Sequence, residues 1–325
     1  MESRSVLTRN EAITRLNKLG SRNQPFSFYC DFLGEQWCIE SNLSDGQSPS
    51  FQLEISDENP GSSIRNPKFS KNPIPFSDFK RAFDQVVSEI NFGNSFLTNL
   101  TFQTPIQTDL TLDEIFNFSR AKYRLLVPDQ FVVFSPETFV KISKGVIYSY
   151  PMKGTIDAGI PDAGALILDD PKELAEHVTI VDLIRNDLSQ VANNVTVSRF
   201  RYIDEIKTNQ KHLIQVSSEV RGSLDANWQH DIGTLLSQLL PAGSISGAPK
   251  PETIRIIKQV ESYQRAFYTG ICGYFDGVNL DTGVMIRFIK KEKNHFYFCS
   301  GGGITSFSKA EKEYQEMIDK VYLAL

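Results

Sequence analysis

The sequence predicts an α+β fold, in which many short strands joined mostly as hairpins are combined with several helices. Two patterns lead to this prediction. Short runs of alternating apolar and polar residues recur along the chain, and a smaller number of segments space their apolar residues with helical periodicity. No internal repeat or low-complexity tract interrupts them, and Gly and Pro are not in excess. We therefore expect a folded body with strands and helices in one α+β arrangement.

The N-terminal part predicts a helix followed by a small antiparallel sheet. Residues 1–22 are expected to form the helix, and residues 26–55 alternate apolar and polar side chains as strands do. Residues 57–75 are rich in Asn, Pro and Ser, which is typical of a loop or linker. We expect residues 1–75 to form a short N-terminal region that packs on the main domain, residues 76–325.

The main domain begins with a predicted helix from about Ser77, whose hydroxyl can cap it, to about Ile90. The last helix is expected to start with a capping box formed by Ser308 and Glu311. Further helices are expected at 111–121, 172–191 and 251–261. Further strands are expected at 95–104, 131–134, 138–142, 146–150, 195–202, 212–220, 269–276, 283–290 and 294–300.

Composition excludes several classes of protein. The 325 residues carry a net charge of −5 without basic blocks, which argues against nucleic acid as a partner. No signal peptide and no apolar run long enough for a bilayer are visible, so we expect a cytoplasmic protein that does not enter a membrane. The 4 cysteines form no C-x-x-C pair, so we expect free thiols rather than a zinc site.

The segment Pro151-Met152-Lys153-Gly154-Thr155 is the most informative stretch of the chain. A lysine at a strand end, beside a glycine that allows close approach to the backbone, can serve as a buried nucleophile. Most lysines are solvated surface groups, so this segment alone is a weak signal. Its interpretation depends on the segments that follow it.

The last predicted helix places Glu313, Glu316 and Lys320 on one face. Two interpretations are open: a solvated face with an ion pair between Glu316 and Lys320, or side chains that point together into a site. The preceding Gly301-Gly302-Gly303, expected to follow a strand, allows close ligand approach and donation from backbone N–H groups, and so favours a site.

Three other segments contain unusual polar residues. Arg287, expected within a strand of apolar residues, is either a rim residue or an anion clamp. The segment from Gly243 to Lys250 lacks the ending of a phosphate loop, which excludes nucleotide binding on that basis. Residues 185–187 (Arg-Asn-Asp) are equally consistent with anchoring a helix.

Taken in order, these segments resemble the chorismate-utilising enzymes from about Ile90 to Leu325. The resemblance implies one chorismate-binding catalytic domain of two face-packed antiparallel sheets with outer helices, and an active site between them. Within the family, the chain most resembles the aminodeoxychorismate synthase component I branch. That branch has a lysine at the position of Lys153, whereas anthranilate synthases usually have an alanine there. That branch aminates chorismate at C4, giving 4-amino-4-deoxychorismate for 4-aminobenzoate and folate synthesis.

The resemblance also implies roles for individual residues. Lys153 would be the nucleophile, neutral and therefore with a lowered pKa, and Glu137 the general acid. Glu176 and Glu316 would hold Mg²⁺, with Glu313 as a further partner through water. The substrate-binding residues would be Arg287, Tyr268, Gly302, Gly303, Lys320, Ser246 and Thr155.

At two positions the chain departs from the pattern of the family, and both positions bear on which product is formed. Leu97 stands where the isochorismate and salicylate makers have a lysine base, and Gln215 stands where anthranilate synthases have a histidine; the nearest histidine here is His212. Both favour a product that keeps its enolpyruvyl group. No glutaminase signature is visible, so ammonia is expected from a separate glutamine amidotransferase subunit or from solution. Anthranilate synthase component I and a catalytically inactive chorismate-binding subunit remain alternatives.

Overall fold

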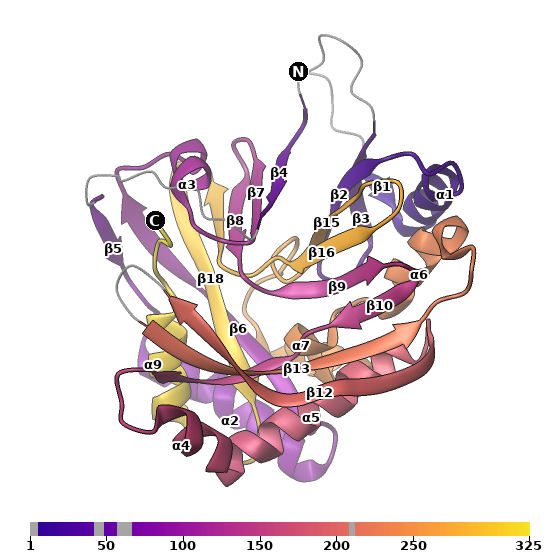
Figure 1. Cartoon of the computed structure of the whole chain (residues 1–325). Helices are drawn as coiled ribbons and strands as arrows, with labels where there is room; N and C mark the ends of the chain where they lie inside the picture. Colours follow the sequence, from indigo (N-terminus) through magenta and orange to yellow (C-terminus); the bar gives the residue numbers. More distant parts are fainter. Residues whose placement is uncertain (1–5, 42–48, 57–66, 208–211) are drawn as a thin grey trace.

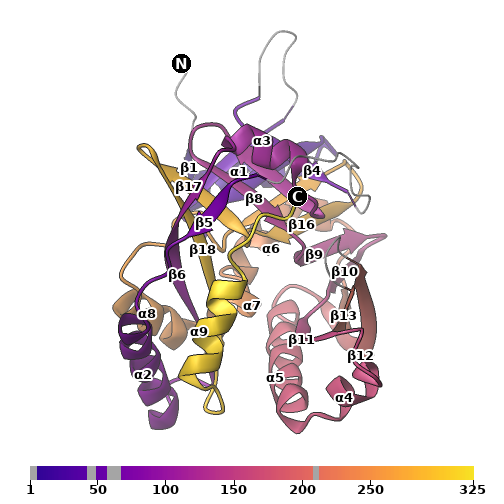
Figure 2. The same ribbon diagram turned by 90° about the vertical axis from the view of Figure 1, so that its left-hand side faces the viewer.

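Two antiparallel β-sheets pack face to face, and helices cover their outer surfaces (Figure 1). This computed structural model describes residues 6–41, 49–56, 67–207 and 212–325. The arrangement confirms the predicted α+β class and its two-sheet architecture. In Figure 2, strands β11 to β13 with α4 and α5 lie on one side of the molecule, and α2, α8 and α9 lie on the other.

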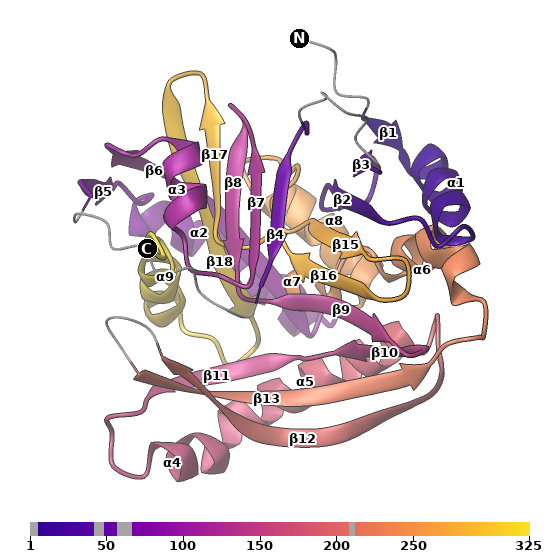
Figure 3. The same ribbon diagram turned by 45° about the horizontal axis from the view of Figure 1, so that its top comes forward.

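The first sheet has ten strands in the described part of the chain. In spatial order they are β1 (Leu7–Thr8), β3 (Gln36–Glu40), β2 (Phe26–Cys30), β15 (Ile271–Phe275), β16 (Leu280–Val284), β9 (Thr138–Ser143), β10 (Val146–Ser149), β13 (His212–Ser223) and β11 (Met152–Asp157), with β12 (Asn193–Lys207) also paired to β13. Figure 3 shows β9 and β10 leading from the centre of this sheet to the long β12–β13 pair. This path places β11 at the far end of the sheet.

The second sheet has eight strands among the described residues. In spatial order they are β14 (Gly247–Ala248), β6 (Leu97–Thr108), β18 (His295–Ile304), β17 (Phe288–Glu292), β8 (Phe131–Ser135), β7 (Tyr123–Val127) and β4 (Gln52–Ile55), with β5 (Phe69–Lys71) also paired to β6. The pairing of β6 with β18 places Leu100 opposite Gly302 and Asn99 opposite Gly303.

The core between the sheets follows from the alternation of side chains along each strand. On β8, Phe131 and Val133 belong to the cluster that also contains Tyr29 and Cys272 of the first sheet. The ring of Phe131 meets that of Tyr29 edge-on, with centroids 5.7 Å apart. Residues Val132 and Phe134, between and after them, point to the opposite face. Strand β8 thus contributes side chains both to the core between the sheets and to the core beneath α3.

Helices cover the outer faces of both sheets. On the first sheet these are α1 (Arg9–Gly20), α5 (Pro171–Leu188) and α6 (Ile232–Leu239). On the second sheet these are α2 (Phe76–Phe92), α3 (Leu112–Phe118), α8 (Lys250–Val260) and α9 (Ala310–Asp319). The remaining helical segments are α4 (Ala163–Asp169), η1 (Trp228–Asp231) and the single turn α7 (Gly243–Ser246). No helix among the described residues is long and apolar enough to cross a membrane.

Local sequence explains several of the helix ends. Thr111 caps α3, and its hydroxyl and backbone N–H both donate to Glu114, at 2.9 and 2.8 Å. Asp170 caps α5 by accepting from the N–H groups of Lys172 and Glu173. At the end of α2, Gly93 adopts a φ of 93°, a left-handed conformation that other residues rarely take.

Several helix predictions were wrong in detail. Within 1–22, the described residues form β1 and then α1, because Thr8 caps the helix with Glu11. The next helix starts at Phe76 after Pro75, so Ser77 lies inside it rather than at its cap. The last helix starts at Ala310 instead of being capped by Ser308. The Ser308 hydroxyl donates to the Glu313 carboxylate, at 2.7 Å, so the predicted capping box is absent.

Strand limits also differed from the predictions. The predicted strand 283–290 is two strands in different sheets, and Arg287 lies between them with a φ of 53°. The glycines 301–303 lie within β18 rather than after a strand. Parts of the predicted segments 1–22, 26–55 and 57–75 lie outside the described residues. The 4 cysteines are buried free thiols, as expected.

Candidate active site

A cleft lies between the end of the β6–β18 pair of the second sheet and β11 with α5 of the first. Its walls come from segments far apart in the sequence (Figure 2). The lining residues are Leu97, Glu137, Met152, Lys153, Glu176, Thr179, Ile180, Ser244, Gly303 and Thr305. The fold thus brings together four predicted site residues, Lys153, Glu137, Glu176 and Gly303, and places Leu97 beside them.

Lys153 reaches the cleft from β11, inside a strand rather than at a strand end. The pairing of β11 with β13 is irregular between Met152 and Thr155. Gly154 has a φ of 84° there, and a Cβ on it would lie 2.8 Å from a Glu173 carboxylate oxygen. Backbone conformation and packing therefore explain this glycine. Lys153 lies within this irregular stretch, and its amine reaches Glu176 on α5.

The charge environment of Lys153 is acidic. Its Nζ lies 2.8 Å from Glu176 Oε2. Burial alone would lower the pKa of Lys153, but attraction to Glu176, Glu316 and Glu313 outweighs burial and raises the pKa above its ordinary value. The expectation of a lowered pKa was therefore wrong for this state of the site. The amine is held as an ammonium by the carboxylates around it.

Glu176 is held in place by the start of α5. The next residue, His177, is buried, and its Nε2 lies 2.7 Å from the hydroxyl of Ser218 on β13. Burial, together with the charge of Arg201, lowers the pKa of His177 to about 4, so the ring is neutral. This contact fixes α5 on the first sheet. The second oxygen of Glu176 lies 3.4 Å from Lys172 Nζ at the rim of the helix.

Glu137 follows β8 on the wall of the cleft, and its carboxyl Oε1 accepts a hydrogen bond from Ser244 Oγ at 2.6 Å. Burial raises the pKa of Glu137 above its ordinary value, although the hydrogen bond from Ser244 and the charges of Arg287 and Lys320 act in the opposite direction. A carboxyl group in this environment holds a proton more readily than one in water. That is the property a general acid requires.

Glu313, Glu316 and Lys320 extend from α9 toward β18. A Cβ on Gly302 would lie 3.6 Å from one oxygen each of Glu313 and Glu316, so the bare backbone leaves this space open. Lys320 Nζ lies 2.7 Å from Glu316 and donates to the Gly301 carbonyl at 2.8 Å. Partial burial opposes the charge of the half-exposed Glu316 side chain, but attraction to Lys320 outweighs it and lowers the pKa of Glu316.

Glu313 has the opposite tendency to Glu316. Burial raises the pKa of Glu313, the charge of Glu316 adds to this effect, and the hydrogen bond from Ser308 does not cancel it. Both interpretations of this face hold in part, since the Glu316–Lys320 ion pair forms and the carboxylates also face Gly302. The arrangement presents two carboxylates beside an open stretch of backbone.

The carboxylates fit a hard cation that keeps some of its waters. Glu176 contacts Lys153 Nζ at 2.8 Å, and the charges of Glu316 and Glu313 also act on this amine, so all three carboxylates favour a cation at that position. Among the described residues, no three acidic, His or Cys side chains stand close enough to form a ready-made metal cage. Mg²⁺ is commonly held by one or two carboxylates plus waters and ligand oxygens, which suits this looser set.

Of the predicted substrate-binding residues, only Gly303 belongs to the cleft lining; Gly302 and Lys320, described above, lie outside it, as do four others. The Ser246 hydroxyl is buried and donates to the Ala242 carbonyl at 2.8 Å. Thr155 is exposed on β11, in register with Gln215. Arg287 turns toward Tyr322, with its Nε 3.3 Å from the phenol oxygen. The side chain of His212 lies outside the described set.

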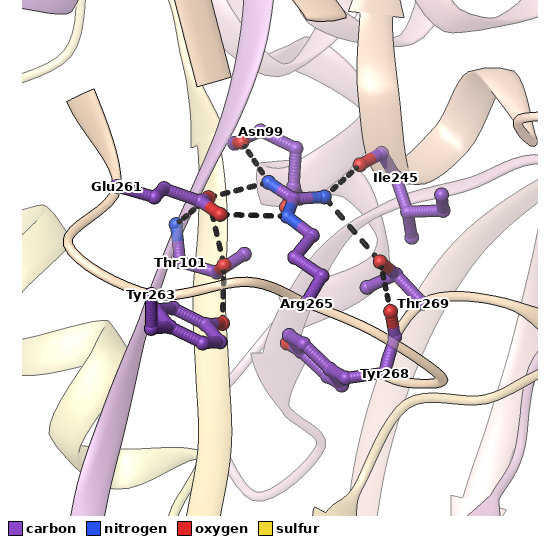
Figure 4. A network of polar contacts seen from close by, with 8 residues as sticks. All are labelled: Asn99, Thr101, Ile245, Glu261, Tyr263, Arg265, Tyr268 and Thr269. Atoms are coloured by element: carbon purple, nitrogen blue, oxygen red, sulfur yellow. Dashed lines mark hydrogen bonds and ion pairs between the residues drawn. The ribbon is translucent and has the colours of Figure 1, made fainter. Parts of the chain in front are cut away.

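Tyr268, the fourth of these residues, is buried beside a network of polar contacts centred on Arg265 (Figure 4). The Arg265 guanidinium pairs with Glu261 at 2.6 Å, and both side chains are almost fully buried. It also donates to the carbonyls of Ile245, at 2.8 Å, and Asn99, at 2.6 Å. These contacts tie α7 to β6 and to the segment that carries Tyr268.

Arg265→Met is expected to destabilise the protein by about 3–5 kcal/mol, because it leaves the buried carboxylate of Glu261 without its partner. Urea unfolding followed by circular dichroism measures the change. The double variant Glu261→Met with Arg265→Met should regain part of the loss, since no unpaired charge remains. A single variant as stable as the natural protein would contradict this reading of the pair.

Sequence reasoning missed Ser244, Thr179 and Thr305 among the lining residues, and Lys172 as a partner of Glu176. Ser244 lay within the Gly243–Lys250 segment that the sequence had singled out, but its partner Glu137 is 107 residues away. Lys172 could have been found from its i,i+4 spacing to Glu176. The threonines gave no signal, because isolated hydroxyl residues are common on helices and loops.

Residues 20–325 match the family of chorismate binding enzymes, and the chain belongs to this family. A protein of Haemophilus influenzae named "Uncharacterized PabA-like protein" is 47% identical over 98% of this chain and 98% of its own length. Aminodeoxychorismate synthase component 1 of Bacillus subtilis is 32% identical over 76% of this chain and 55% of its own length.

Solved structures show the same fold. Anthranilate synthase component I from Streptococcus pneumoniae superposes with a TM-score of 0.65 and 25% identity, over 78% of this chain and 58% of that one. The menaquinone-specific isochorismate synthase MenF from Escherichia coli superposes with a TM-score of 0.74 and 16% identity, over 97% of this chain and 82% of that one. At that identity the second likeness concerns the fold alone.

Proposed function

We propose that this chain is a cytoplasmic aminodeoxychorismate synthase component I, which replaces the C4 hydroxyl of chorismate by an amino group. The observation that carries the proposal is that Lys153 and Glu137 line the same cleft, beside Gly303. A Cβ on Gly303 would lie 3.8 Å from Lys153 Nζ, so a ligand against this backbone would be next to the amine. A nucleophile and a proton donor therefore face one ligand space.

The chemistry divides into two displacements. In the first, Lys153 Nζ bonds to C2 of chorismate, both ring double bonds move by one position, and the C4 hydroxyl leaves as water with the proton of Glu137. In the second, ammonia bonds to C4, the double bonds move back, and Lys153 leaves as a neutral amine. One proton of the new ammonium group restores the acid form of Glu137. Atoms and charges then balance over one turnover.

Lys153 must give up a proton before it attacks. The nearest acceptor is Glu176 Oε2, 2.8 Å from Nζ. As long as no metal ion occupies Glu176, Glu316 and Glu313, their charges raise the pKa of Lys153 and keep the amine protonated. The resting charge of the cleft therefore holds the amine inactive until these carboxylates bind another group or take up the proton.

The same carboxylates are the proposed Mg²⁺ site. Glu176 from α5 and Glu316 from α9 would hold the ion, with Glu313 joining through water. Bound there, Mg²⁺ would hold the ring carboxylate of chorismate and neutralise carboxylate charge. Lys320, beside Glu316, would add positive charge for the same substrate carboxylate.

Ammonia is proposed to come from a glutamine amidotransferase subunit. The described thiols are all buried, and burial raises the pKa of Cys272 and of Cys299 to about 12 in each case. Thiols in this state are poor nucleophiles, which fits a chain that receives its ammonia from elsewhere.

The test is product analysis with chorismate, Mg²⁺ and ammonium, with and without a lyase that converts aminodeoxychorismate to 4-aminobenzoate. We expect 4-aminobenzoate only when the lyase is present. Anthranilate, detected by its fluorescence, would instead identify an anthranilate synthase, the activity named for the pneumococcal structure. No consumption of chorismate under any condition would indicate an inactive binding subunit.

Glu176→Ala and Glu316→Ala are each expected to abolish turnover and to weaken Mg²⁺ binding measured by isothermal titration calorimetry, because each removes an ionised oxygen ligand. Glu311→Gln is a control for the loss of a carboxylate, since Glu311 is an exposed acidic residue on the same helix as Glu316. Near-normal activity with unchanged Mg²⁺ dependence in either alanine variant would contradict the metal assignment.

A further inference from the structure

The contact between Ser244 and Glu137 joins the α7 turn to the wall that carries the carboxyl group. We propose that Ser244 is a positioning residue, whose hydroxyl fixes Glu137 so that the acid proton is carried on Oε2 rather than on Oε1. The proposal rests on the proposed function only in taking Glu137 as the general acid. It concerns which of the two carboxyl oxygens faces the substrate as the donor.

The hydrogen bonds of Glu137 leave one carboxyl oxygen, Oε2, available to donate the proton. Its backbone is fixed on both sides, because its N–H donates to Ser135 Oγ at 3.2 Å and its carbonyl accepts from the Val284 N–H at 3.0 Å. Oε1 accepts from Ser244 Oγ at 2.6 Å. Within the described residues, Oε2 takes part in no hydrogen bond. The two oxygens of the carboxyl group are therefore in different environments.

The hydroxyl of Ser244 is carried by a turn that is itself held firmly. Arg265 donates to the Ile245 carbonyl at 2.8 Å, one residue after Ser244 (Figure 4). Gly247 pairs with Thr98 on β6, and the Ala248 carbonyl accepts from the Phe96 N–H at 2.9 Å. Ser244 therefore approaches Glu137 from a turn that is hydrogen-bonded to Arg265 and continues into a segment paired with β6.

Because the two oxygens of a neutral carboxylic acid differ, this contact determines which of them carries the proton. In the neutral acid, the carbonyl oxygen is the better acceptor and the other oxygen carries the proton. A hydroxyl that donates to Oε1 stabilises the form in which Oε1 is the carbonyl oxygen. The proton then resides on Oε2, which is available to a leaving hydroxyl group.

Other charges near Glu137 do not make this distinction. Arg287 and Lys320 both act on the carboxyl group through space, and both lower its pKa, as the hydrogen bond from Ser244 also does. A distant charge acts on the two oxygens almost equally, whereas a hydrogen bond acts on one of them. Removal of the Ser244 hydroxyl should therefore raise the pKa of Glu137 and also remove the preference for Oε2.

Infrared spectroscopy tests this without turnover. The C=O stretch of protonated Glu137 is identified as the band that Glu137→Gln removes, and it is followed across pH. In Ser244→Ala the band should move to higher frequency and persist to higher pH, because the carbonyl oxygen loses its donor. Ser244→Thr, which keeps a hydroxyl, should restore both properties. Ser189→Ala, in which the lost hydroxyl is exposed and donates to the Arg185 carbonyl, is the control and should leave the band unchanged.

Turnover provides the second measurement. Ser244→Ala should lower kcat by roughly 10- to 100-fold with little change in KM, because a misplacement of a reacting group by about 1 Å can cost about 10²-fold, and Ser244→Thr should recover most of it. A Glu137 band that is identical in Ser244→Ala, in a folded protein, overturns the proposal. If the natural protein makes no aminodeoxychorismate, the proposed function fails while the infrared result still decides the role of Ser244.

Discussion

Lys153→Ala is expected to lose aminodeoxychorismate formation by roughly 10³-fold or more, because a deleted nucleophile removes the covalent route rather than slowing it. Binding of Mg²⁺ should remain and even strengthen. In the natural protein, the ammonium group of Lys153 lies 2.8 Å from Glu176 and competes with any other cation for the same carboxylates. Calorimetry with Mg²⁺ and with chorismate separates this outcome from simple loss of structure.

Lys172→Ala is the matched control for this variant. Lys172 also contacts Glu176, at 3.4 Å, but through the other carboxylate oxygen and from the rim. Its removal takes away a positive charge near the same group without deleting the proposed nucleophile, so most activity should remain. Equal losses in both variants would mean that Lys153 acts only through its charge.

Mass spectrometry addresses the covalent step directly. Under turnover with chorismate and little ammonia, the intact protein should gain the mass of chorismate minus water, and peptide mapping should place the adduct on Lys153. A fully active Lys153→Ala enzyme would defeat the covalent scheme. It would also remove the main reason for preferring amination at C4 over anthranilate formation.

The pKa of Lys153 shows what a sequence cannot reveal about a site. A lowered pKa was expected because the proposed reaction needs a neutral amine, and burial alone would lower the pKa. The carboxylates that reverse the effect come from α5 and from α9, at the opposite end of the chain. Only the folded arrangement puts Glu176 and Glu316 beside the same amine.

Local elements were predictable where nearby residues decide them. The capping box of α3, Thr111 with Glu114, lies within one turn of helix, and the helix 111–121 was expected for that part of the chain. The break at Arg287 was not predictable. Apolar residues run through Met285 and Ile286, yet the chain leaves one sheet and enters the other there, with Arg287 in a left-handed conformation.

The separation of site residues along the chain sets a similar limit. The resemblance picked Glu176 and Glu316 because they match family positions, and nothing in their spacing marks them as partners. Ser244 shows the reverse case. Its segment was noticed for a partial likeness to a phosphate loop, but its contact with Glu137 depends on the packing of α7 against the wall after β8. Pairs of this kind need the tertiary structure.

Glu137→Gln is expected to lower turnover by about 10²–10⁴-fold, because an amide cannot donate the proton that the leaving hydroxyl requires. The shape and hydrogen-bonding capacity of the side chain are nearly kept, so chorismate binding should change little. Ser244 can still donate to the amide oxygen. The effect should therefore appear in kcat rather than in KM.

The pH dependence of the natural enzyme provides an independent check on Glu137. Only the protonated carboxyl group can act as the acid, so activity should fall as pH rises through the pKa of Glu137. Burial raises that pKa, so the fall should lie at higher pH than an ordinary glutamate would give. Glu137→Asp keeps an acid but withdraws it by one methylene. This variant should still lose activity as pH rises, and its kcat should be lower at every pH. An active Glu137→Gln enzyme with an unchanged pH profile would show that another group, or water, protonates the leaving oxygen.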